Sequence, residues 1–477
     1  MTSARASERS VDVSSIDYIE EPPRRTRRVS DYEVIVAGGG TAGVIAAVAA
    51  ARNGARTLLV ERGGFLGGHI ASQLLEHSAG WFDARGQRIV GGLPQELVER
   101  LVAAGASPGH VRDDTGYTLS RVPVNHELFK SVVTALCHEA GVDLLMFSPV
   151  VEVLRDGASV TGVIVENKSG RTAYAARAVV DCTGDADVAE RAGCRFLSTR
   201  TDADSTQPVS LLFKLGGIDH ARLLDHVEAH ADDYRLGVPV SALRGEAHVN
   251  LWGFGPELRR AHADGMVSLA RNELHYSGWA LTGEAVINVT RCAVDATRAE
   301  EMGRAEVVLR RQVQEFAEFF RRYVPGAERC FLSASASCVG VRESRRIQGR
   351  TVLADDDVRQ GRRFPDGVLR GGFPIDSHDP KGASLDSAEH VAGGYDIPLG
   401  ALLPSGVDGL LVAGRCISAE RKALASARIS GTCMAMGQAA GTAAALAAAG
   451  RCAPGALDVA RLQATLAAQG AILGTAA

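Results

Sequence analysis

The chain has 477 residues, of which 46% are hydrophobic and 23% are charged, and its formal net charge is −4. This composition is typical of about two to four globular domains, or of one large nucleotide-binding fold with an inserted domain, and it excludes disorder as the main state. Because the charge is nearly balanced, no broad basic field exists, and we expect no nucleic-acid partner.

The nine cysteines form no Cys-x-x-Cys pair. The sequence therefore lacks metal-ligand spacing and a redox-active cysteine pair, and we predict no metal site. An odd number of scattered cysteines is typical of reduced thiols in the cytoplasm, which is the location that we expect. No run of about eighteen uncharged apolar residues occurs, so we predict no membrane span.

Residues 1–30 are polar and contain the basic run Pro22 to Arg28. A flexible tail is the favoured interpretation. A twin-arginine export signal is the alternative, but the apolar stretch that follows leads straight into a glycine-rich turn and is better explained as a first strand.

The next segment has the order strand, turn, helix, strand. Val34 to Ala37 predicts a strand, the residues from Val44 to Arg52 predict a helix of small side chains, and Thr57 to Val60 predicts a second strand that ends at Glu61. This is the opening unit of a dinucleotide-binding fold.

The turn between them has the order Gly38-x-Gly40-x-x-Gly43, with Thr41 and Ala42 as the last two variable positions. The first glycine would make the tight turn, the second would let the backbone approach a pyrophosphate, and the third would let helix and strand pack closely. The phosphates would lie at the start of the helix. The Glu61 carboxylate would accept hydrogen bonds from ribose hydroxyls.

Further along, residues 125–140 predict an amphipathic helix and residues 142–147 a strand. Three short strands, Val150 to Leu154, Val160 to Glu166 and Arg171 to Arg177, alternate with turn residues and predict an antiparallel meander. Residues 178–181 predict a buried strand that leads into a turn. That turn consists of Thr183, Gly184 and Asp185.

From about residue 205 to 385 the pattern changes to short strands with mixed histidines, acids and arginines, and a long helix is predicted from Ala299 to Tyr323. Nucleotide-binding character returns at Gly409 to Arg415, followed by a small-residue helix over about 432–449 and a surface helix over about 457–473. We interpret the middle region as an inserted domain.

Four segments carry a family resemblance. They are GLLVAGRCISAERKALASARISGTCMAMGQAAG (409–441), GVRESRRIQGR (340–350), RGGFPIDSHDP (370–380) and YDIPLGALLP (395–404). They resemble the FAD-dependent oxidoreductase family, which is related to the succinate dehydrogenase and fumarate reductase flavoprotein superfamily. The resemblance covers roughly residues 31–475. The sequence departs from the family at Leu399-Gly400, where members often have Tyr-Arg, and at Glu420-Arg421-Lys422.

The resemblance implies an α/β fold with a Rossmann-like FAD-binding domain, that is, a glutathione-reductase-type parallel sheet with a β-meander, and an inserted α+β substrate (cap) domain. The expected boundaries are a tail over 1–30, the FAD-binding domain over 31–205 and again over 385–477 with the C-terminal helix, and the cap domain over 206–384.

The resemblance also implies cofactor contacts. Val150 would bind adenine through its backbone, and Thr183, Gly184 and Asp185 would line the pyrophosphate and ribityl side. Gly414 and Arg415 would close on the ribityl chain. Gly431 and Thr432, at the start of the last long helix, would face flavin N1 and O2 and stabilise negative charge there. Arg62, Gly67 and Gly68 complete the expected cofactor site.

His69 follows the second strand at the offset where the succinate dehydrogenase flavoproteins place their flavin-linked histidine. We therefore hypothesise a bond between His69 and the flavin 8α-methyl carbon. A histidine that only contacts the flavin ring or a phosphate is the alternative.

For catalysis, the fumarate reductase relatives use arginines and a histidine to hold a dicarboxylate. The candidates here are Arg342, Arg346, Arg428 and His378. Arginine suits fork-shaped recognition of carboxylates, but an ion-pair network around Glu343 and an exposed loop histidine are the structural alternatives.

We expect an FAD-dependent dehydrogenase or oxidase that moves a hydride between a small, anionic organic substrate and flavin N5. An FAD-dependent monooxygenase acting through a flavin hydroperoxide is the alternative, and a non-catalytic FAD-binding protein is disfavoured. The direction of the reaction, the electron acceptor and a homo-oligomeric state stay open.

Overall fold

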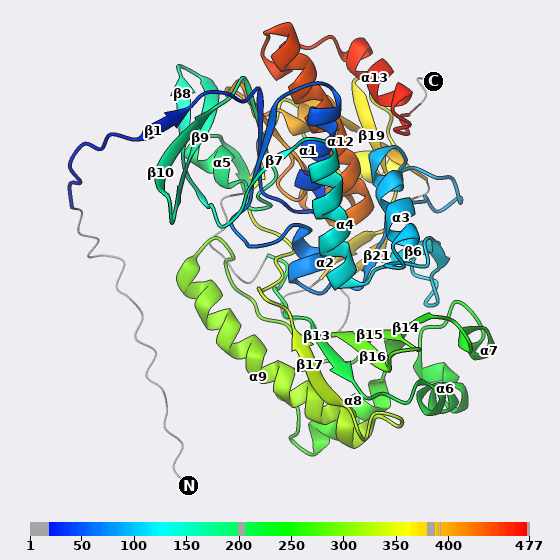
Figure 1. Cartoon of the computed structure of the whole chain (residues 1–477). Coiled ribbons are helices and arrows are strands. Elements are labelled where there is room, and N and C mark those ends of the chain that lie inside the picture. Colours follow the sequence, from blue (N-terminus) through cyan, green and yellow to red (C-terminus); the bar gives the residue numbers. More distant parts are fainter. Residues whose placement is uncertain (1–18, 199–205, 379–386, 390, 392, 475–477) are drawn as a thin grey trace.

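The computed structural model describes residues 19–198, 206–378, 387–389, 391 and 393–474, and these form two bodies that lie one above the other in Figure 1. The upper body combines the N-terminal part of the chain with its C-terminal part. The lower body holds the middle of the chain, including the long helix α9 (Ala299–Tyr323).

A five-stranded sheet organises the upper body. Its order is β23-β11-β2-β3-β7, and every pairing is parallel. Four of its strands are buried along their whole length, which explains their largely apolar sequences: the edge strand β23 and the inner strands β11, β2 and β3. The strands are β2 (Val34–Ala37), β3 (Thr57–Val60), β7 (Asp143–Leu145), β11 (Ala178–Asp181) and β23 (Leu410–Val412).

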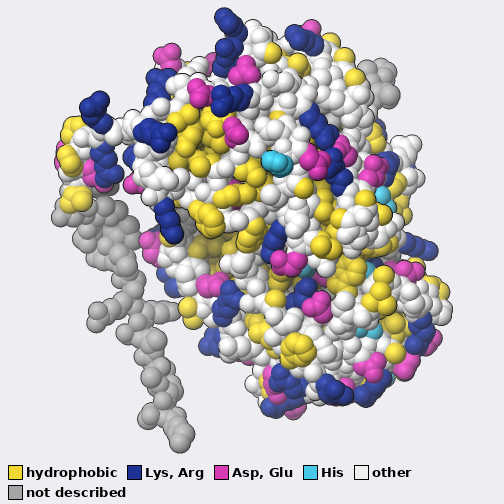
Figure 2. Space-filling model, in the orientation of Figure 1, with side chains coloured by type: hydrophobic (Ala, Val, Ile, Leu, Met, Phe, Trp, Pro, Cys, Tyr) yellow, Lys and Arg dark blue, Asp and Glu magenta, His cyan; other side chains and the backbone are white. Residues whose placement is uncertain are grey.

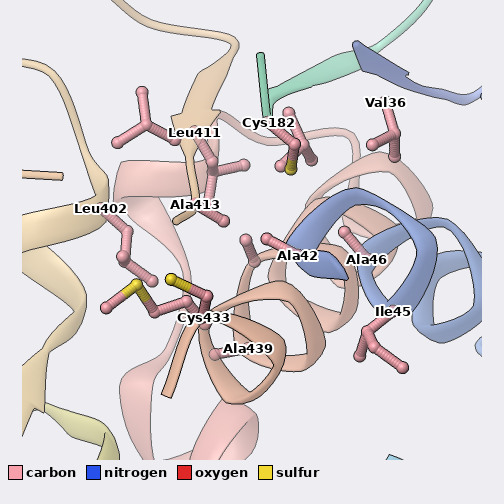
Figure 3. Close-up of a cluster of buried hydrophobic side chains, with 14 of the residues drawn as sticks. Val36, Ala42, Ile45, Ala46, Cys182, Leu402, Leu411, Ala413, Cys433 and Ala439 are labelled. Carbon is pink, nitrogen blue, oxygen red and sulfur yellow. The ribbon is translucent and has the colours of Figure 1, made fainter. Parts of the chain in front are cut away.

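Two helices of small residues pack against each other beside this sheet. They are α1 (Thr41–Arg52) and α12 (Ser430–Gly450), and Figure 3 shows Ala42 and Ala46 of α1 next to Cys433 and Ala439 of α12. A Cβ on Gly437 would lie 2.2 Å from the Ala42 carbonyl oxygen, and one on Gly441 would lie 2.1 Å from that of Ala46. The small side chains are therefore a requirement of backbone contact.

A second sheet confirms the predicted meander. Strands β8 (Val150–Asp156), β9 (Ser159–Asn167) and β10 (Gly170–Ala175) pair antiparallel in that order. The structure adds β1 (Arg27–Val29), which pairs parallel with β10. The expected tail over 1–30 is therefore partly ordered, because these three residues find a sheet edge, while residues 1–18 lie outside the described part of the chain.

The lower body is an antiparallel sheet of order β14-β15-β16-β13-β17, covered by α9. The buried face of α9 carries Leu309, Val313, Phe316 and Phe320, at the spacing that a helix needs to present one apolar side. The strands are β13 (Phe213–Gly216), β14 (His248–Gly253), β15 (Leu274–Trp279), β16 (Glu284–Asn288) and β17 (Phe331–Ser335), and α6 (His220–Ala229), α7 (Val240–Leu243) and α8 (Gly255–Ala263) complete the body.

Each body has its own apolar core. The core of the lower body includes residues from Val209 to Val339, whereas the core of the upper body resumes at Ile347. Residues 347–375 therefore contribute to the upper core, although the sequence led us to expect the inserted region to extend to residue 384. The proposed domain boundary moves accordingly towards residue 340.

The remaining elements frame the space between the bodies. Near it lie α2 (Gly68–Ser72), β4 (His77–Ser78), β5 (Val111–Arg112), β6 (Ser120–Pro123) and β20 (Ile375–Ser377). The others are α3 (Leu93–Ala103), α4 (His126–Glu139), α5 (Asp187–Arg191), β12 (Phe196–Ser198), β18 (Arg346–Ile347), α10 (Asp355–Gln360), β19 (Gly367–Gly371), β21 (Ser387–Glu389), β22 (Tyr395–Pro398), α11 (Arg421–Ala427) and α13 (Val459–Ala468), with short 3-10 turns at Ala231–Asp233, Leu399–Leu402 and Pro454–Ala456.

On the face that Figure 2 shows, basic and acidic side chains are interspersed. Among the helices that the structure describes, none combines the length and the apolar character that crossing a bilayer requires. The nine cysteines are all free, and six of them are buried.

Candidate functional site

A cavity of about 1180 Å³ lies between the two bodies. It is larger than the roughly 300–1,000 Å³ of an ordinary small-molecule pocket. Its wall includes the glycine turn after β2, residues at the carboxyl ends of β3, β11 and β23, and side chains from β14 and β15 of the lower body. The carboxyl edge of a parallel sheet is where ligands of such folds bind.

Each of the three glycines of the first turn is required for a different structural reason. Gly38 has φ +97°, and a Cβ there would lie 2.4 Å from the Cys182 carbonyl oxygen. A Cβ on Gly43 would lie 1.8 Å from the Gly38 carbonyl oxygen. Gly40 is different, because a Cβ there would meet no atom nearer than 3.9 Å, and the residue lines the cavity. Gly40 therefore keeps space free for a ligand.

The helix that follows this turn opens on the cavity. Thr41 and Ala42 line the cavity, and no side chain caps the N-terminus of α1. An uncapped helix N-terminus presents backbone N–H groups and the positive end of the helix dipole, which together bind phosphate.

Glu61 lies at the end of β3 and lines the cavity. One carboxylate oxygen accepts a hydrogen bond of 2.6 Å from the Gly39 N–H, and the other accepts one of 2.6 Å from the Gly63 N–H. The two amides fix the carboxylate beside the glycine turn, where a ribose hydroxyl could donate to it.

Asp185 and Arg415 form the third part of the wall. Arg415 donates to Asp185 at 2.7 Å and to the Ser344 hydroxyl at 2.6 Å, and Ser344 donates to the same aspartate at 2.7 Å. Burial alone would raise the pKa of Asp185, but Arg415 and Ser344 bring it below its ordinary value. Asp185 is therefore an anion held by the chain itself.

Most of the predicted cofactor residues line this one cavity. These are Gly38, Gly40, Thr41, Ala42, Glu61, Arg62, Gly68, His69, Val150, Thr183, Gly184, Asp185, Gly414 and Arg415. Gly43, Gly67, Gly431 and Thr432 are not among the lining residues. The backbone N–H groups of two of these four already have partners within the protein: Gly67 donates to the Gly39 carbonyl and Gly431 donates to the Ala79 carbonyl.

His69 lies in α2 and lines the cavity. Burial lowers the pKa of its imidazole to about 4, and the charges of Arg415 and Arg428 contribute to the shift. At neutral pH the ring is therefore uncharged, with a nitrogen lone pair available.

A polar cluster lies on the same cavity. Asp376 contacts Arg428 at 3.2 Å and the His378 Nε2 at 3.3 Å. Burial alone would raise the pKa of Asp376, but His378, Arg428 and Arg342 bring it well below its ordinary value. Burial lowers the pKa of His378 to about 3, with Arg342 and Arg291 opposing its protonation. The cluster is thus a carboxylate beside a neutral imidazole.

The four predicted catalytic residues do not all meet. Arg342 lines the cavity, and its Nη1 donates to the Pro208 carbonyl at 2.7 Å. Arg346 is not among the lining residues: it donates to the Ala419 carbonyl at 2.7 Å and lies 3.9 Å from Glu343. Arg346 therefore fits the alternative of a structural ion-pair network around Glu343. Arg342, Arg428 and His378 lie together on the cavity wall.

Sequence reasoning missed several side chains of this wall, among them Asp376, Arg291, Tyr117, Trp252 and His275. Asp376 stands two residues before the predicted His378, and a carboxylate that close to a candidate base was the one available signal. The others come from loops and strands with no motif of their own.

Comparisons with known proteins show the family of this chain. A family model described as FAD dependent oxidoreductase matches residues 33–466. The digeranylgeranylglycerophospholipid reductase of Picrophilus torridus is 28% identical over 167 residues, which are 32% of this chain and 39% of that protein. The chain thus matches about two fifths of that relative's length.

Solved structures are similar at lower identity. A geranylgeranyl bacteriochlorophyll reductase-like protein of Thermoplasma acidophilum gives a TM-score of 0.47 at 13% identity over 93% of this chain and 85% of that one. The p-nitrophenol 4-monooxygenase of Pseudomonas putida gives 0.40 at 14% identity over 68% and 70%.

Proposed function

This chain belongs to the FAD-dependent oxidoreductase family, and from that premise we propose that it moves a hydride between a small anionic organic substrate and flavin N5. The chain is an enzyme, and FAD is its cofactor. The observation that carries the proposal is that Arg342, Arg428 and the Asp376–His378 pair line the same cavity as the glycine turn. Bound FAD supplies a two-electron carrier to this space.

The residues present fit an extended dinucleotide. Gly40 leaves a cradle that a Cβ would fill, and the uncapped start of α1 adjoins it. Glu61, on the same wall, would receive the ribose, and Val150 would face the adenine. Asp185, with Arg415, would hold the ribityl side.

The chain's own groups would handle the substrate anion and a proton. Arg342 and Arg428 would orient the anionic group. Asp376 accepts from the His378 Nε2–H, which leaves the His378 Nδ1 as the unprotonated nitrogen. Within the described part of the chain this Nδ1 is buried without a hydrogen-bond partner. His378 would thus take a proton from the substrate at Nδ1.

Substrate binding would make His378 a better base. Its pKa is low because it is buried and because arginine charges surround it. A substrate carboxylate beside Arg342 would offset those charges and raise the pKa of His378 towards the working pH. Proton transfer would therefore depend on the anion being present.

We extend the proposal to a covalent bond between a His69 imidazole nitrogen and the flavin 8α-methyl carbon. Forming it would break one 8α C–H bond and release the proton, and the two electrons would pass through the flavin to O₂ as the oxidant. The bond is supported by the neutral, buried imidazole on the cavity wall. Finding this bond would also support a relation between this chain and the succinate dehydrogenase and fumarate reductase flavoproteins. Acid precipitation tests it: the flavin should stay with the protein pellet and should move to the supernatant in His69→Ala. Yellow colour wholly in the wild-type supernatant would exclude the bond.

We likewise interpret the parallel sheet and the meander as a Rossmann-like FAD-binding domain of the glutathione-reductase type, and the antiparallel body as the inserted cap domain. Support comes from the strand order and from the two separate apolar cores.

Anaerobic mixing of the flavin-bound enzyme with a panel of small carboxylates tests the hydride-transfer proposal. We expect at least one to bleach the visible flavin absorbance, with recovery on adding oxygen, a quinone or another acceptor. If only NADPH or NADH bleached the flavin, and a parallel reaction in air put oxygen atoms from O₂ into the product, the monooxygenase alternative would replace the proposal.

A further inference from the structure

Five aromatic side chains form a continuous row along the cavity, which we call the ring wall: Phe373, Tyr117, Trp252, His275 and His77. Successive ring centroids are 5.8, 5.5, 5.8 and 5.6 Å apart. Two of the four contacts, Tyr117–Trp252 and His77–His275, join the upper body to the lower body. All five residues line the cavity. Rings in edge-to-face contact at this spacing make a rigid apolar surface.

The alternation of the strands aims this surface into the cavity. In the lower sheet Trp252 of β14 is paired with His275 of β15, and the next pair along is Leu251 with Tyr276. Leu251 and Tyr276 are fully buried in the core, whereas Trp252 and His275 keep exposed surface. Because neighbouring residues of a strand face opposite sides, the sheet fills its core with one face and lines the cavity with the other.

A pair of arginines, Arg291 and Arg342, lies on the cavity wall beside the ring wall, where the charge of Arg291 acts on His275. Arg291 donates to the Asn288 side chain at 3.0 Å and to the Thr290 carbonyl at 2.7 Å, and Arg342 donates to the Pro208 carbonyl. Within the described ranges no carboxylate lies within ion-pair distance of either guanidinium. Both residues line the cavity.

The burial of this arginine pair is costly. Burial lowers the pKa of Arg342 to about 9 and that of Arg291 well below its ordinary value, and the positive charges nearby add to both shifts. Asp376 opposes the shifts, but it already contacts Arg428 and His378. A bound anion would supply the missing countercharge, and arginine forks suit a carboxylate.

The His77 end of the ring wall does not favour a second anion. Burial lowers the pKa of His77 to about 3 and that of His275 to about 4, so both rings are uncharged at neutral pH. Asp113 lines the cavity there. Burial alone would raise its pKa, but Thr115 and Arg121 bring it below the ordinary value, so it stays an anion. A second carboxylate there would meet the like charge of Asp113, and the neighbouring Arg121 is already paired with Asp113 and Asp114.

We propose, on the premise of the proposed function, that the substrate is a monocarboxylate carrying an aromatic or otherwise flat unsaturated ring. Its carboxylate binds Arg342 and Arg291. Arg291 takes the place given above to Arg428, because Asp376 already balances the charge of Arg428. The substrate ring lies along Tyr117, Trp252 and His275. The arrangement selects against aliphatic dicarboxylates, which lack a ring for the wall and bring a second charge towards Asp113.

Four probes of similar size test this assignment on the flavin-bound enzyme: benzoate, neutral benzamide, terephthalate and fumarate. Binding is followed by the shift of the visible flavin spectrum. We expect benzoate to bind about tenfold or more tightly than each of the other three, because each lacks the ring, lacks the charge or carries one charge too many. Fumarate or terephthalate binding as tightly as benzoate, or no probe binding at all, would overturn the proposal.

Two variants separate the parts of the site. Arg342→Gln should weaken benzoate about tenfold or more and leave benzamide unchanged, whereas Trp252→Leu should weaken both alike. Arg244→Gln, on a surface arginine paired with Asp225 and Glu228, and Phe331→Leu, on the exposed strand β17, are the matched controls. Equal loss for benzoate and benzamide in Arg342→Gln would contradict the placement of the carboxylate.

The same samples distinguish failure of this inference from failure of the proposed function. A protein that holds FAD and is reduced and reoxidised, yet shows no preference among the probes, keeps the proposed function and loses the substrate class. A protein whose bound flavin takes no electrons from any carboxylate, while benzoate still binds tightly, keeps the anion and ring site and loses the proposed function.

Discussion

His378 shows how one side chain depends on its neighbours. It is held by Asp376 at 3.3 Å and surrounded by arginine charges. If it accepts a proton from the substrate, His378→Asn should lower kcat by about 10²–10⁴-fold. His138→Asn, on an exposed position of α4, should leave kcat unchanged. A His378→Asn enzyme with nearly full kcat would show that another group takes the proton.

The pH profile tests the same residue with a defined sign. Burial lowers the pKa of His378 to about 3 in the free enzyme, so the base form persists into acid and kcat/KM should fall only at low pH. A bound carboxylate should raise that pKa, so kcat should begin to fall at a higher pH than kcat/KM. Steady-state kinetics from about pH 4 to about pH 8 should show kcat falling towards acid while kcat/KM stays level, because a pKa of about 3 lies below this range. Coinciding limbs would contradict a base whose pKa depends on the substrate anion.

The sequence predicted some residues of the site but not others. Arg342 and Arg346 belong to the same short arginine-rich run, and nothing in the letters says that one reaches the cavity while the other binds the Ala419 carbonyl. Tyr117, Trp252 and Arg291 carry no motif, since their shared wall exists only after distant segments meet. The glycine turn was easier to predict from the sequence than these side chains, because the backbone geometry at Gly38 and Gly43 leaves no room for a Cβ.

At the scale of elements, the contact between α1 and α12 sets the position of the phosphate-binding turn. Gly441→Ala would place a Cβ 2.1 Å from the Ala46 carbonyl oxygen. We expect a loss of about 1–3 kcal/mol in the free energy of unfolding, and weaker FAD binding because α1 must shift. Chemical denaturation and FAD titration measure the two effects.

Gly303→Ala is the matched control, since Gly303 lies in α9 with no atom within 4 Å of its added Cβ. It should keep or raise stability, because alanine favours a helix over glycine. If Gly441→Ala were as stable as this control, the close approach of the two helices would be wrong.

Elements with a strong local pattern were predictable. The first strand–turn–helix–strand unit, the meander, α9 and α12 all occur within a few residues of their predicted positions. Strand β1 was not predictable, because three residues of a polar segment become a strand only where β10 offers an open edge. The end of the inserted region stays a proposal. The two apolar cores favour placing it near residue 340, because core membership depends on contacts that the sequence alone does not show.

At the scale of the whole molecule, buried histidines link stability to pH. Burial lowers the pKa of His69 and His275 to about 4 and that of His77 and His378 to about 3, whereas a histidine in the unfolded chain has a pKa near 6.5. Below about pH 6.5 the unfolded state therefore binds more protons, so stability is fully present above that pH and is lost as pH falls.

Each such histidine should contribute up to about 1.4 kcal/mol per pH unit between about pH 6.5 and its folded-state pKa. We expect the denaturant midpoint to fall steadily from about pH 7 to about pH 5. His77→Asn should reduce that slope, and His138→Asn should not. A midpoint independent of pH over this range would mean that the four rings protonate freely in the folded protein.

The location in the cytoplasm stays a prediction at this scale, and the electron acceptor and the oligomeric state stay open. Both bodies contribute to the cavity: the upper body supplies the glycine turn, and the lower body supplies residues of β14 and β15.

We propose that the space above Gly40 receives the FAD phosphates. The decisive test is titration of the deflavinated protein with FAD, carried out in the His69→Ala background, where the proposed covalent bond cannot form. We predict that the His69→Ala protein binds one FAD per chain. Adding Gly40→Val should leave the melting temperature of this protein unchanged, because the added Cβ meets nothing nearer than 3.9 Å, yet FAD should bind about a hundredfold or more weakly. Unchanged FAD affinity after Gly40→Val in a folded protein would contradict the account.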